Sequence, residues 1–316
     1  MNIEKIFDYA RENNISDIHL LEGEKIYFRK DGEIVVYDGT DTVSKEELLE
    51  ICNEKIEEDF SYTDSKSQRY RVNSFLTRGK LALVIRIINK EPIKLKGKFI
   101  NKLIDEKILS LKDGLVLVTG ITGSGKSTTL ANIIEKLNRN KNLKILTIED
   151  PIEYIFENKK SLIIQRELGK DVESFEKALK SSLRQDPDVI ILGEIRDEES
   201  LYSALKLAET GHLVFSTLHT MNTVESVNRL ISMVRSEKKD FISEQLASVL
   251  RFILSQELYR GKKTVPIFEI LNNTKAVANL ILNNKLNQIP TLIESGIENF
   301  MITKTKYLKN IETESD

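Results

Sequence analysis

The spacing of apolar residues changes along the chain and predicts two regions of different architecture. In the first region the apolar runs are short. The runs 26–29 and 34–37 flank Asp31-Gly32, which is a strong signal for a β-hairpin. Residues 44–56 have a helical pattern, and two further strand-like runs surround a turn at Arg78. We therefore expect a small α+β domain over residues 1–92.

From residue 99 onward, strand-like and helix-like segments alternate, which predicts an α/β domain with a parallel sheet. The predicted strands are 115–118, 143–148, 161–167, 189–192 and 213–217. Residues 93–98 are rich in lysine and contain a glycine, so we expect a linker there. The second domain then covers residues 99–316, and its last part, from Val224, is expected to be helical.

Composition narrows the function classes. The chain has 316 residues, with 47 Lys and Arg against 49 Asp and Glu, and this small acidic excess argues against a nucleic-acid partner. Cys52 is the only cysteine, which excludes an internal disulfide and a cysteine-cluster zinc site. The first residues lack the layout of a secretory signal, and no apolar run is long enough to cross a bilayer. We expect a cytoplasmic protein.

One short segment carries the clearest chemistry. Residues 120–127 read Gly-Ile-Thr-Gly-Ser-Gly-Lys-Ser, and they stand between an apolar strand and a predicted helix. This context is typical of a phosphate-binding loop, in which backbone N–H groups and the helix N-terminus face the phosphates. The expected binding residues are Gly120, Thr122, Gly123, Ser124, Gly125, Lys126, Ser127 and Thr128. The cofactors would be ATP and Mg²⁺, with the Ser127 hydroxyl on the metal.

Acidic residues follow two of the predicted strands. Glu194 ends the strand around 189–192, where a carboxylate can hold Mg²⁺ beside a phosphate loop. Residues 147–154 contain three more carboxylates, one of which could orient or deprotonate water. The alternative for both segments is an ordinary solvated loop.

Histidines and arginines supply further candidates. His212 and His219 stand at the two ends of one predicted strand, where neutral structural histidines are the alternative. Arg71, Arg78 and Arg86 fall on the hairpin of the first domain, and an arginine from a neighbouring subunit can stabilise charge on a transferring phosphoryl group. The alternative is a solvated strand edge.

Four motifs in order resemble the secretion and type IV pilus ATPase superfamily. Residues 120–128 resemble its Walker A loop, 145–154 (ILTIEDPIEY) its aspartate box, 183–197 (LRQDPDVIILGEIRD) its Walker B region and 210–220 (TGHLVFSTLHT) its histidine box. Ser16–Leu20 and Arg69–Asn73 also match. Within the superfamily the chain is most similar to the PilT family of pilus retraction ATPases, in length and in segments such as Gln165–Glu167.

The resemblance implies a fold and a set of roles. It implies a RecA-like P-loop NTPase core with a PAS-like N-terminal α+β domain, assembled as a homo-hexamer with ATP between subunits. Glu153 takes the position of the catalytic glutamate and Glu194 that of the Walker B acid. His212 and His219 take the histidine-box positions, and the three arginines match residues that approach the nucleotide. The expected partners are a membrane platform protein (PilC-like), which would recruit the ATPase to the inner face of the membrane, and indirectly pilin.

One departure leaves the direction of the motor open. The family motif AIRNLIRE, which is tied to retraction, is replaced at 276–283 by AVANLILN, without the two arginines and the glutamate. An extension, competence or type II secretion ATPase is therefore an alternative to a retraction ATPase. A nucleotide-switched assembly module is a further alternative, and the set of acidic residues near the phosphate loop argues against it. A nucleic-acid motor is another, and the small acidic excess of the chain argues against it.

Overall fold

The computed structural model describes residues 3–13, 15–30, 32–39, 42–53, 55–66, 68–88, 92, 94–261 and 264–315, the side chains of 314 and 315 excepted. Asp31 of the predicted hairpin turn and Ile93 of the predicted linker lie outside these residues. The internal contacts divide the chain into two compact units. Unit 1 comprises Met1–Glu91 and Pro151–Ile155, and unit 2 comprises Pro92–Asp150 and Phe156–Asp316.

Unit 1 is built on an antiparallel sheet with the strand order β3-β2-β1-β6-β5-β4. Its strands are β1 (Asp17–Leu21), β2 (Tyr27–Lys30), β3 (Glu33–Val36), β4 (Asp59–Thr63), β5 (Arg69–Thr77) and β6 (Lys80–Ile87). The two predicted hairpins are confirmed as β2–β3 and β5–β6.

Two helices supply the core of unit 1. Helix α1 (Ile3–Glu12) and helix α2 (Lys45–Cys52) contribute buried apolar residues to the same cluster as alternate residues of β1 and β6. Helix α2 is shorter than the predicted 44–56, because Asn53 adopts a left-handed conformation (φ 47°, ψ 47°) that ends it. Ser44 and Glu47 form a capping box at its start.

Unit 2 contains the predicted parallel sheet, which is confirmed, with the order β13-β12-β7-β11-β10-β8-β9. The strands are β7 (Gly114–Thr119), β8 (Lys144–Glu149), β9 (Leu162–Glu167), β10 (Val189–Leu192), β11 (Leu213–Leu218), β12 (Leu250–Arg260) and β13 (Thr264–Asn272). All neighbouring pairs are parallel except β12–β13, which is an antiparallel hairpin. The carboxyl ends of β7, β8, β10 and β11 consequently meet at one edge.

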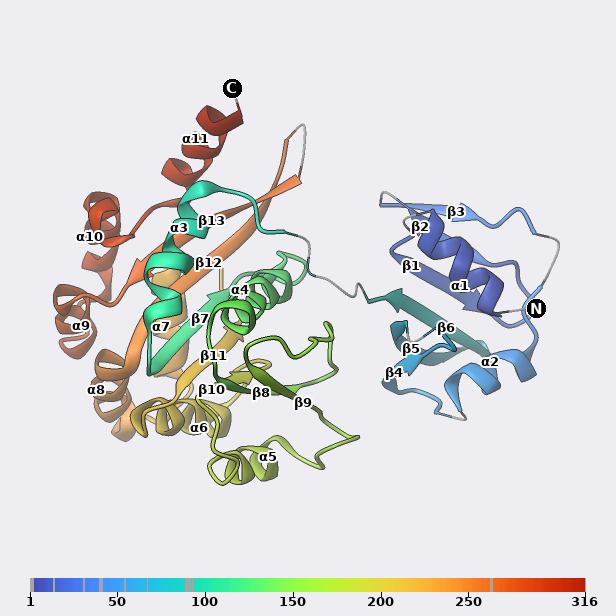
Figure 1. Ribbon diagram of the computed structural model, residues 1–316, viewed down its shortest axis with the longest axis horizontal. Helices are drawn as coiled ribbons and strands as arrows, with labels where there is room; N and C mark the ends of the chain where they lie inside the picture. The colour runs from blue at the N-terminus through green and yellow to red at the C-terminus, as the bar shows by residue number, and fades with distance from the viewer. Residues whose placement is uncertain are drawn as a thin grey trace. The chain divides into compact units, whose positions relative to one another are not determined.

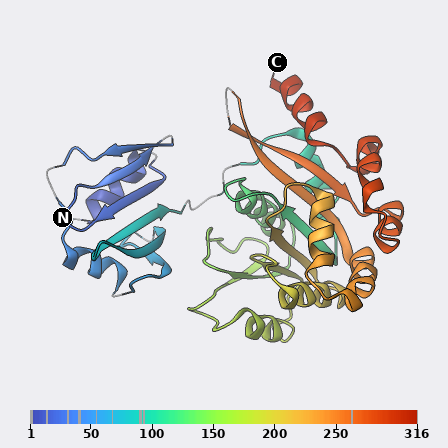
Figure 2. The ribbon, with the colours of Figure 1, turned by 180° about the vertical axis from the view of Figure 1, so that it is seen from behind.

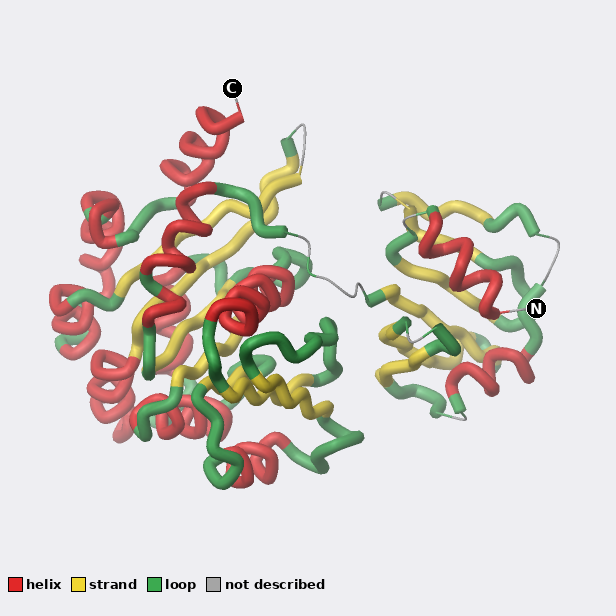
Figure 3. Tube along the Cα trace, in the orientation of Figure 1, coloured by secondary structure: helices red, strands yellow, loops and turns green. Residues whose placement is uncertain are grey.

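Helices cover both faces of this sheet, as Figures 1 and 2 show from opposite sides and Figure 3 shows with helices and strands in separate colours. On one face Val116 and Val118 of β7 pack with apolar residues of three helices, α3 (Lys98–Glu106), α4 (Lys126–Asn140) and α11 (Lys304–Ser315). On the other face Leu115 and Leu117 of β7 pack with apolar residues of six more helices. These are α5 (Phe175–Ser182), α6 (Glu198–Glu209), α7 (Thr223–Ser232), α8 (Lys239–Val249), α9 (Lys275–Leu282) and α10 (Ile289–Ser295). Such two-sided burial explains the almost continuous apolar runs of the parallel strands.

The C-terminal part differs from the sequence prediction. It contains the helices α7 to α11, but the long β12–β13 hairpin interrupts them and extends the sheet beside β7. The run from Leu250 to Leu254 follows α8 without a glycine or proline to mark the change. A short apolar run of this kind is compatible with a buried strand or a buried helix, so periodicity could not identify the strand.

Candidate functional site

Residues 120–125 lead from β7 into α4 and form the predicted glycine-rich loop. Every residue of β7 is buried, and the strand ends at Thr119, so the loop begins at the carboxyl edge of the sheet. The φ angles are 151° at Gly120, 78° at Gly123 and 85° at Gly125, a region that residues with a side chain rarely adopt. The path of the loop therefore requires glycine at these three positions.

The loop opens directly into the first turn of α4, where Lys126, Ser127 and Thr128 lie. The residue before the helix, Gly125, has no side chain to cap the first turn. The first N–H groups of a helix lack partners inside it, and the helix dipole gives this end a partial positive charge. The loop and the helix start together offer the kind of site that binds a phosphate group.

Lys126 folds back on the loop. Its side chain is only 8% exposed, and Nζ donates hydrogen bonds to the carbonyl oxygens of Gly120 (2.7 Å) and Ile121 (3.1 Å). The ammonium group is thus held against the backbone at the positions where a phosphate-binding loop uses it. Phosphate oxygens carry more charge than carbonyl oxygens, so they would compete well for the same donors.

Acidic residues lie beside the loop at the carboxyl edge of the sheet, here called the acidic edge, and His219 connects them to the loop. His219 follows β11, and its Nε2 lies 3.1 Å from Oε2 of Glu194, which follows β10. Its Nδ1 lies 3.5 Å from Oγ1 of Thr122 in the loop. The structure therefore brings together three of the predicted site residues from three neighbouring strand ends. The His219 side chain is 47% exposed, so this edge is open to a ligand.

Arg196 extends this line of contacts, although sequence reasoning did not assign it a role. It forms an ion pair with Oε1 of Glu194, and its Nη1 lies 3.7 Å from Oδ2 of Asp150 after β8. The only signal available in the sequence was its position two residues after Glu194, inside the 183–197 motif. Arg196 offsets the negative charge of two carboxylates at this edge.

The three carboxylates at and after the end of β8 have different surroundings. Glu149 accepts hydrogen bonds from Thr147 Oγ1 (2.6 Å) and Gln165 Nε2 (3.1 Å), so its position is fixed inside unit 2. Asp150 faces Arg196, whereas Glu153 belongs to the segment that groups with unit 1. The Glu153 side chain is 45% exposed, which leaves it accessible to water.

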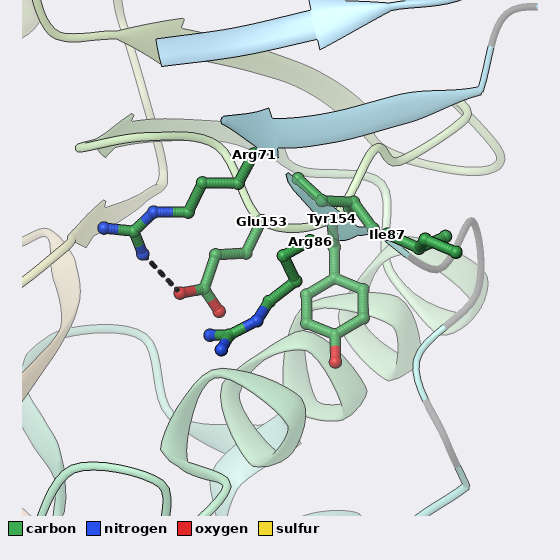
Figure 4. Close-up of a pocket in the computed structure, with 6 residues that line it drawn as sticks. Arg71, Arg86, Ile87, Glu153 and Tyr154 are labelled. Atoms are coloured by element: carbon green, nitrogen blue, oxygen red, sulfur yellow. Dashed lines mark ion pairs between the residues drawn. The ribbon is translucent and has the colours of Figure 1, made fainter. Parts of the chain in front are cut away.

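In unit 1, Glu153 shares a pocket with two of the predicted arginines. Arg71 on β5 and Arg86 on β6 are direct cross-strand partners. Together with Ile87, Ile88, Glu153 and Tyr154 they line the pocket, and Figure 4 shows the ends of both arginines near the Glu153 carboxylate. Arg71 Nη1 lies 3.9 Å from Glu153 Oε1, and each arginine also pairs with an aspartate, Asp59 or Asp17. Two guanidinium groups this close are suited to an anionic ligand.

Two predicted site residues are not brought to these clusters. Arg78 lies at the turn between β5 and β6, with a left-handed φ of 52°, and is not among the residues that line the pocket. His212 lies at the start of β11, the opposite end from His219, and its Nδ1 is 3.1 Å from Leu207 O at the end of α6. Any role of His212 therefore has to be exercised away from the phosphate loop of its own chain.

Comparison with known proteins identifies the family. A model of the type II/IV secretion system protein family matches residues 1–285. The chain is 40% identical to YggR of Escherichia coli (strain K12) over 96% of both chains. It is 35% identical to the type IV pilus retraction ATPase PilT of Pseudomonas aeruginosa, over 98% of this chain and 94% of PilT. The chain belongs to the PilT family of ATPases.

The fold supports the same assignment. A crystal structure of the pilus retraction motor PilT with bound ADP has a TM-score of 0.87 and 35% identity, covering 99% of this chain and 94% of that one. The family match includes every candidate site residue of this PilT-family chain. Among the helices that the structure describes, none combines the length and the apolar character needed to span a bilayer.

The Glu194 segment is held in place by a helix cap, which gives a stability prediction. Asp197 begins α6, accepts a hydrogen bond from Ser200 N (2.8 Å), and its own N–H donates to Ser200 Oγ. The backbone hydrogen bond from Ser200 holds the pKa of Asp197 below its usual value. We expect Asp197→Ala to lower the free energy of unfolding by about 1 kcal/mol at neutral pH.

The pH dependence of that loss follows from the lowered pKa. The ionised cap contributes stability above the usual carboxyl pKa, and the contribution disappears as the pH falls through the lower folded-state pKa. Urea unfolding of wild type and Asp197→Ala should therefore differ at neutral pH and converge in acid. Asp197→Asn, which keeps an acceptor, should lose less. An equal deficit at every pH would contradict the capping role.

Proposed function

We propose that this chain binds and hydrolyses ATP, and that hydrolysis drives the retraction of type IV pili. The observation that carries the proposal is the line of contacts from Thr122 in the phosphate loop through His219 to Glu194. A phosphate cradle with an acid at its side supplies two of the parts that ATP hydrolysis requires, and a metal ion and a residue that activates water would complete them. Similarity along almost the full chain to a pilus retraction motor that binds ADP supports both the nucleotide and the motor role.

Phosphate binding is assigned to the loop and the start of α4. Lys126 would offset charge on the β- and γ-phosphates, and the backbone around Gly120, Thr122, Gly123, Ser124, Gly125 and Thr128 would hold phosphate oxygens. Ser127 and Glu194 offer hydroxyl and carboxylate oxygens, the ligand type that Mg²⁺ prefers. Mg²⁺ held there would supply positive charge that offsets the negative charge of the phosphates. No group of three or more His, Cys, Asp or Glu side chains within the described ranges could hold a metal ion by itself.

Water activation is assigned to Glu153. Its carboxylate is partly exposed and is not fixed by hydrogen bonds of the kind that hold Glu149. Arg71 and Arg86, which line the same pocket, would meet the negative charge of the nucleotide. Arg78 is kept as a further candidate for this role, at the tip of the hairpin.

Assembly and partners complete the proposal. Six copies would form a closed ring in which ATP lies between neighbouring subunits, and each interface would be heterologous. His212, at the far end of β11 from the loop, would act at such an interface. The ring would be recruited to the inner face of the cell membrane by a PilC-like platform protein and would release pilin subunits from the pilus base.

One observation favours pilus extension as a second candidate. At the end of α9, Leu282 is 50% exposed and Asn283 is also exposed. These positions take the place of an arginine and the glutamate in the retraction-linked motif, so the exposed surface here lacks the charges of that motif. We expect ATP hydrolysis to be unaffected by this difference, whereas the partner that binds this surface would differ.

Deleting the gene distinguishes the two directions. If the chain is a retraction motor, the deletion strain should carry more surface pili than its parent and should lose twitching motility, because fibres are made but not removed. The measurement is a count of surface pili by electron microscopy, with complementation by the wild-type gene as the control. A strain without pili would instead support extension.

A further inference from the structure

We infer that Gln256 on β12 is a positioning residue for the phosphate loop, an inference that rests on the nucleotide-binding function proposed above. Strand β12 pairs with β7 as far as Ser255, whose partner Thr119 is the last residue of β7. Beyond that point β12 continues with β13 as its neighbour, and Gln256 pairs with Phe268. Gln256 therefore lies beside the loop that begins where β7 ends.

The side chain of Gln256 joins two parts of the phosphate site. It is only 3% exposed, and its Nε2 donates a hydrogen bond of 2.6 Å to the carbonyl oxygen of Ser124 in the loop. Its Oε1 accepts one of 2.6 Å from Oγ1 of Thr129, which is fully buried in the first turns of α4. The carboxamide thus fixes the loop and the helix to the same strand, because its NH₂ group donates to one and its oxygen accepts from the other.

The backbone of the loop also approaches β12 closely. A Cβ atom at Gly120 would lie 2.3 Å from the carbonyl oxygen of Gln256, and one at Gly125 would lie 2.9 Å from Nε2. A Cβ at Gly123 would meet nothing within 4 Å. The first and last glycines of the loop therefore make room for Gln256, whereas Gly123 is on an open side of the loop.

The hydrogen bond to Ser124 determines the direction of one backbone donor. In a trans peptide group the C=O and the following N–H point in opposite directions. Because the Ser124 carbonyl faces Gln256, the N–H of Gly125 points away from β12. Loss of the Nε2 donor would free this peptide group to rotate and to turn a carbonyl toward the bound phosphates, where it would repel them. Gln256 thus contributes to phosphate binding without touching the nucleotide.

The test compares two variants of the full chain, using ADP as the binding probe and ATP as the substrate. Gln256→Met removes both hydrogen bonds at similar size, and Gln256→Glu keeps the acceptor for Thr129 but removes the donor to Ser124. We expect each to raise the Kd for ADP and the KM for ATP about tenfold, with kcat changed less than about threefold, because the loop binds ground state and transition state alike.

A matched control separates positioning from general stability. Asn273 has a side-chain amide that donates to Ala247 O (2.9 Å) and Leu250 O (3.0 Å) at the other end of β12. Asn273→Ala should lower the melting temperature of the nucleotide-free protein but leave the Kd for ADP unchanged. If Gln256→Met does not fold, Gln256→Glu carries the test, since it preserves the shape of the side chain.

Wild-type affinity for ADP in the Gln256 variants, with or without a lower melting temperature, would overturn the inference and leave the proposed function intact. Failure of the wild-type chain to bind ADP would contradict the proposed function, and the inference with it.

Discussion

Replacing Lys126 with alanine should reduce ATP turnover at least about 100-fold and should weaken ATP binding. Lys126 is 8% exposed and its ammonium group is held by two loop carbonyls, so its charge acts in a partly desolvated site. Electrostatic groups of this kind, aimed at charge that develops in the transition state, each contribute about 10²–10³ in kcat. The measurement is phosphate release from Mg-ATP by the purified variant, together with equilibrium binding of ATP.

Lys136→Ala provides the matched control, because Lys136 lies on the same helix and its Nζ pairs with Asp105 at 2.8 Å. That variant loses the same charge and the same side chain away from the loop, and should turn over ATP at the wild-type rate. Undiminished hydrolysis by Lys126→Ala would remove the basis for assigning phosphate binding to residues 120–128.

The proximity of several candidate site residues could be predicted from the sequence, for a physical reason. The residues Lys126, Glu194 and His219 each follow a short apolar run, and those runs are now β7, β10 and β11. Parallel strands place their carboxyl ends at one edge, so position along the chain translates directly into proximity. The observed contact between Glu194 and His219 follows from this rule and from the adjacency of β10 and β11.

The sequence did not predict strand β12 or the contacts that this strand makes with the phosphate loop. The apolar run of β12 is equally compatible with a buried helix. Its pairing with β7 brings together residues that lie more than a hundred positions apart in the sequence. The side-chain hydrogen bond between Gln256 and Thr129 is one result. The role of Arg196 was also missed, because an arginine in a motif gives no indication of which carboxylates it will contact. Side-chain partners of this kind are determined by tertiary packing.

The two neighbours of β7 hold its loop in chemically different ways. On the β11 side the contact is between Thr122 and His219, whose side chain is 47% exposed. On the β12 side it is the buried and neutral carboxamide of Gln256. The first contact is accessible to a ligand, whereas the second is enclosed in the core of unit 2.

Replacing Glu153 with glutamine should slow turnover by about 10²–10⁴ while leaving ATP binding close to wild type. Glutamine has the same size but cannot accept the proton of the attacking water, and general-base catalysis contributes about 10²–10⁴ in rate. The nearest charged partner of Glu153 in unit 1 is Arg71, at 3.9 Å, so the substitution removes one weak ion pair and no buried contact. We expect kcat to fall by that factor with KM for ATP changed by less than about threefold.

Glu157→Gln is the control for this change, since Glu157 lies four residues further along the chain and is exposed. It should hydrolyse ATP normally. If Glu153→Gln also hydrolyses ATP normally, Glu153 is not the base, and Asp150, the remaining carboxylate whose contact is a distant ion pair with Arg196, becomes the candidate. Glu149 is a poorer candidate in either case, because two hydrogen bonds already direct its carboxylate toward Thr147 and Gln165.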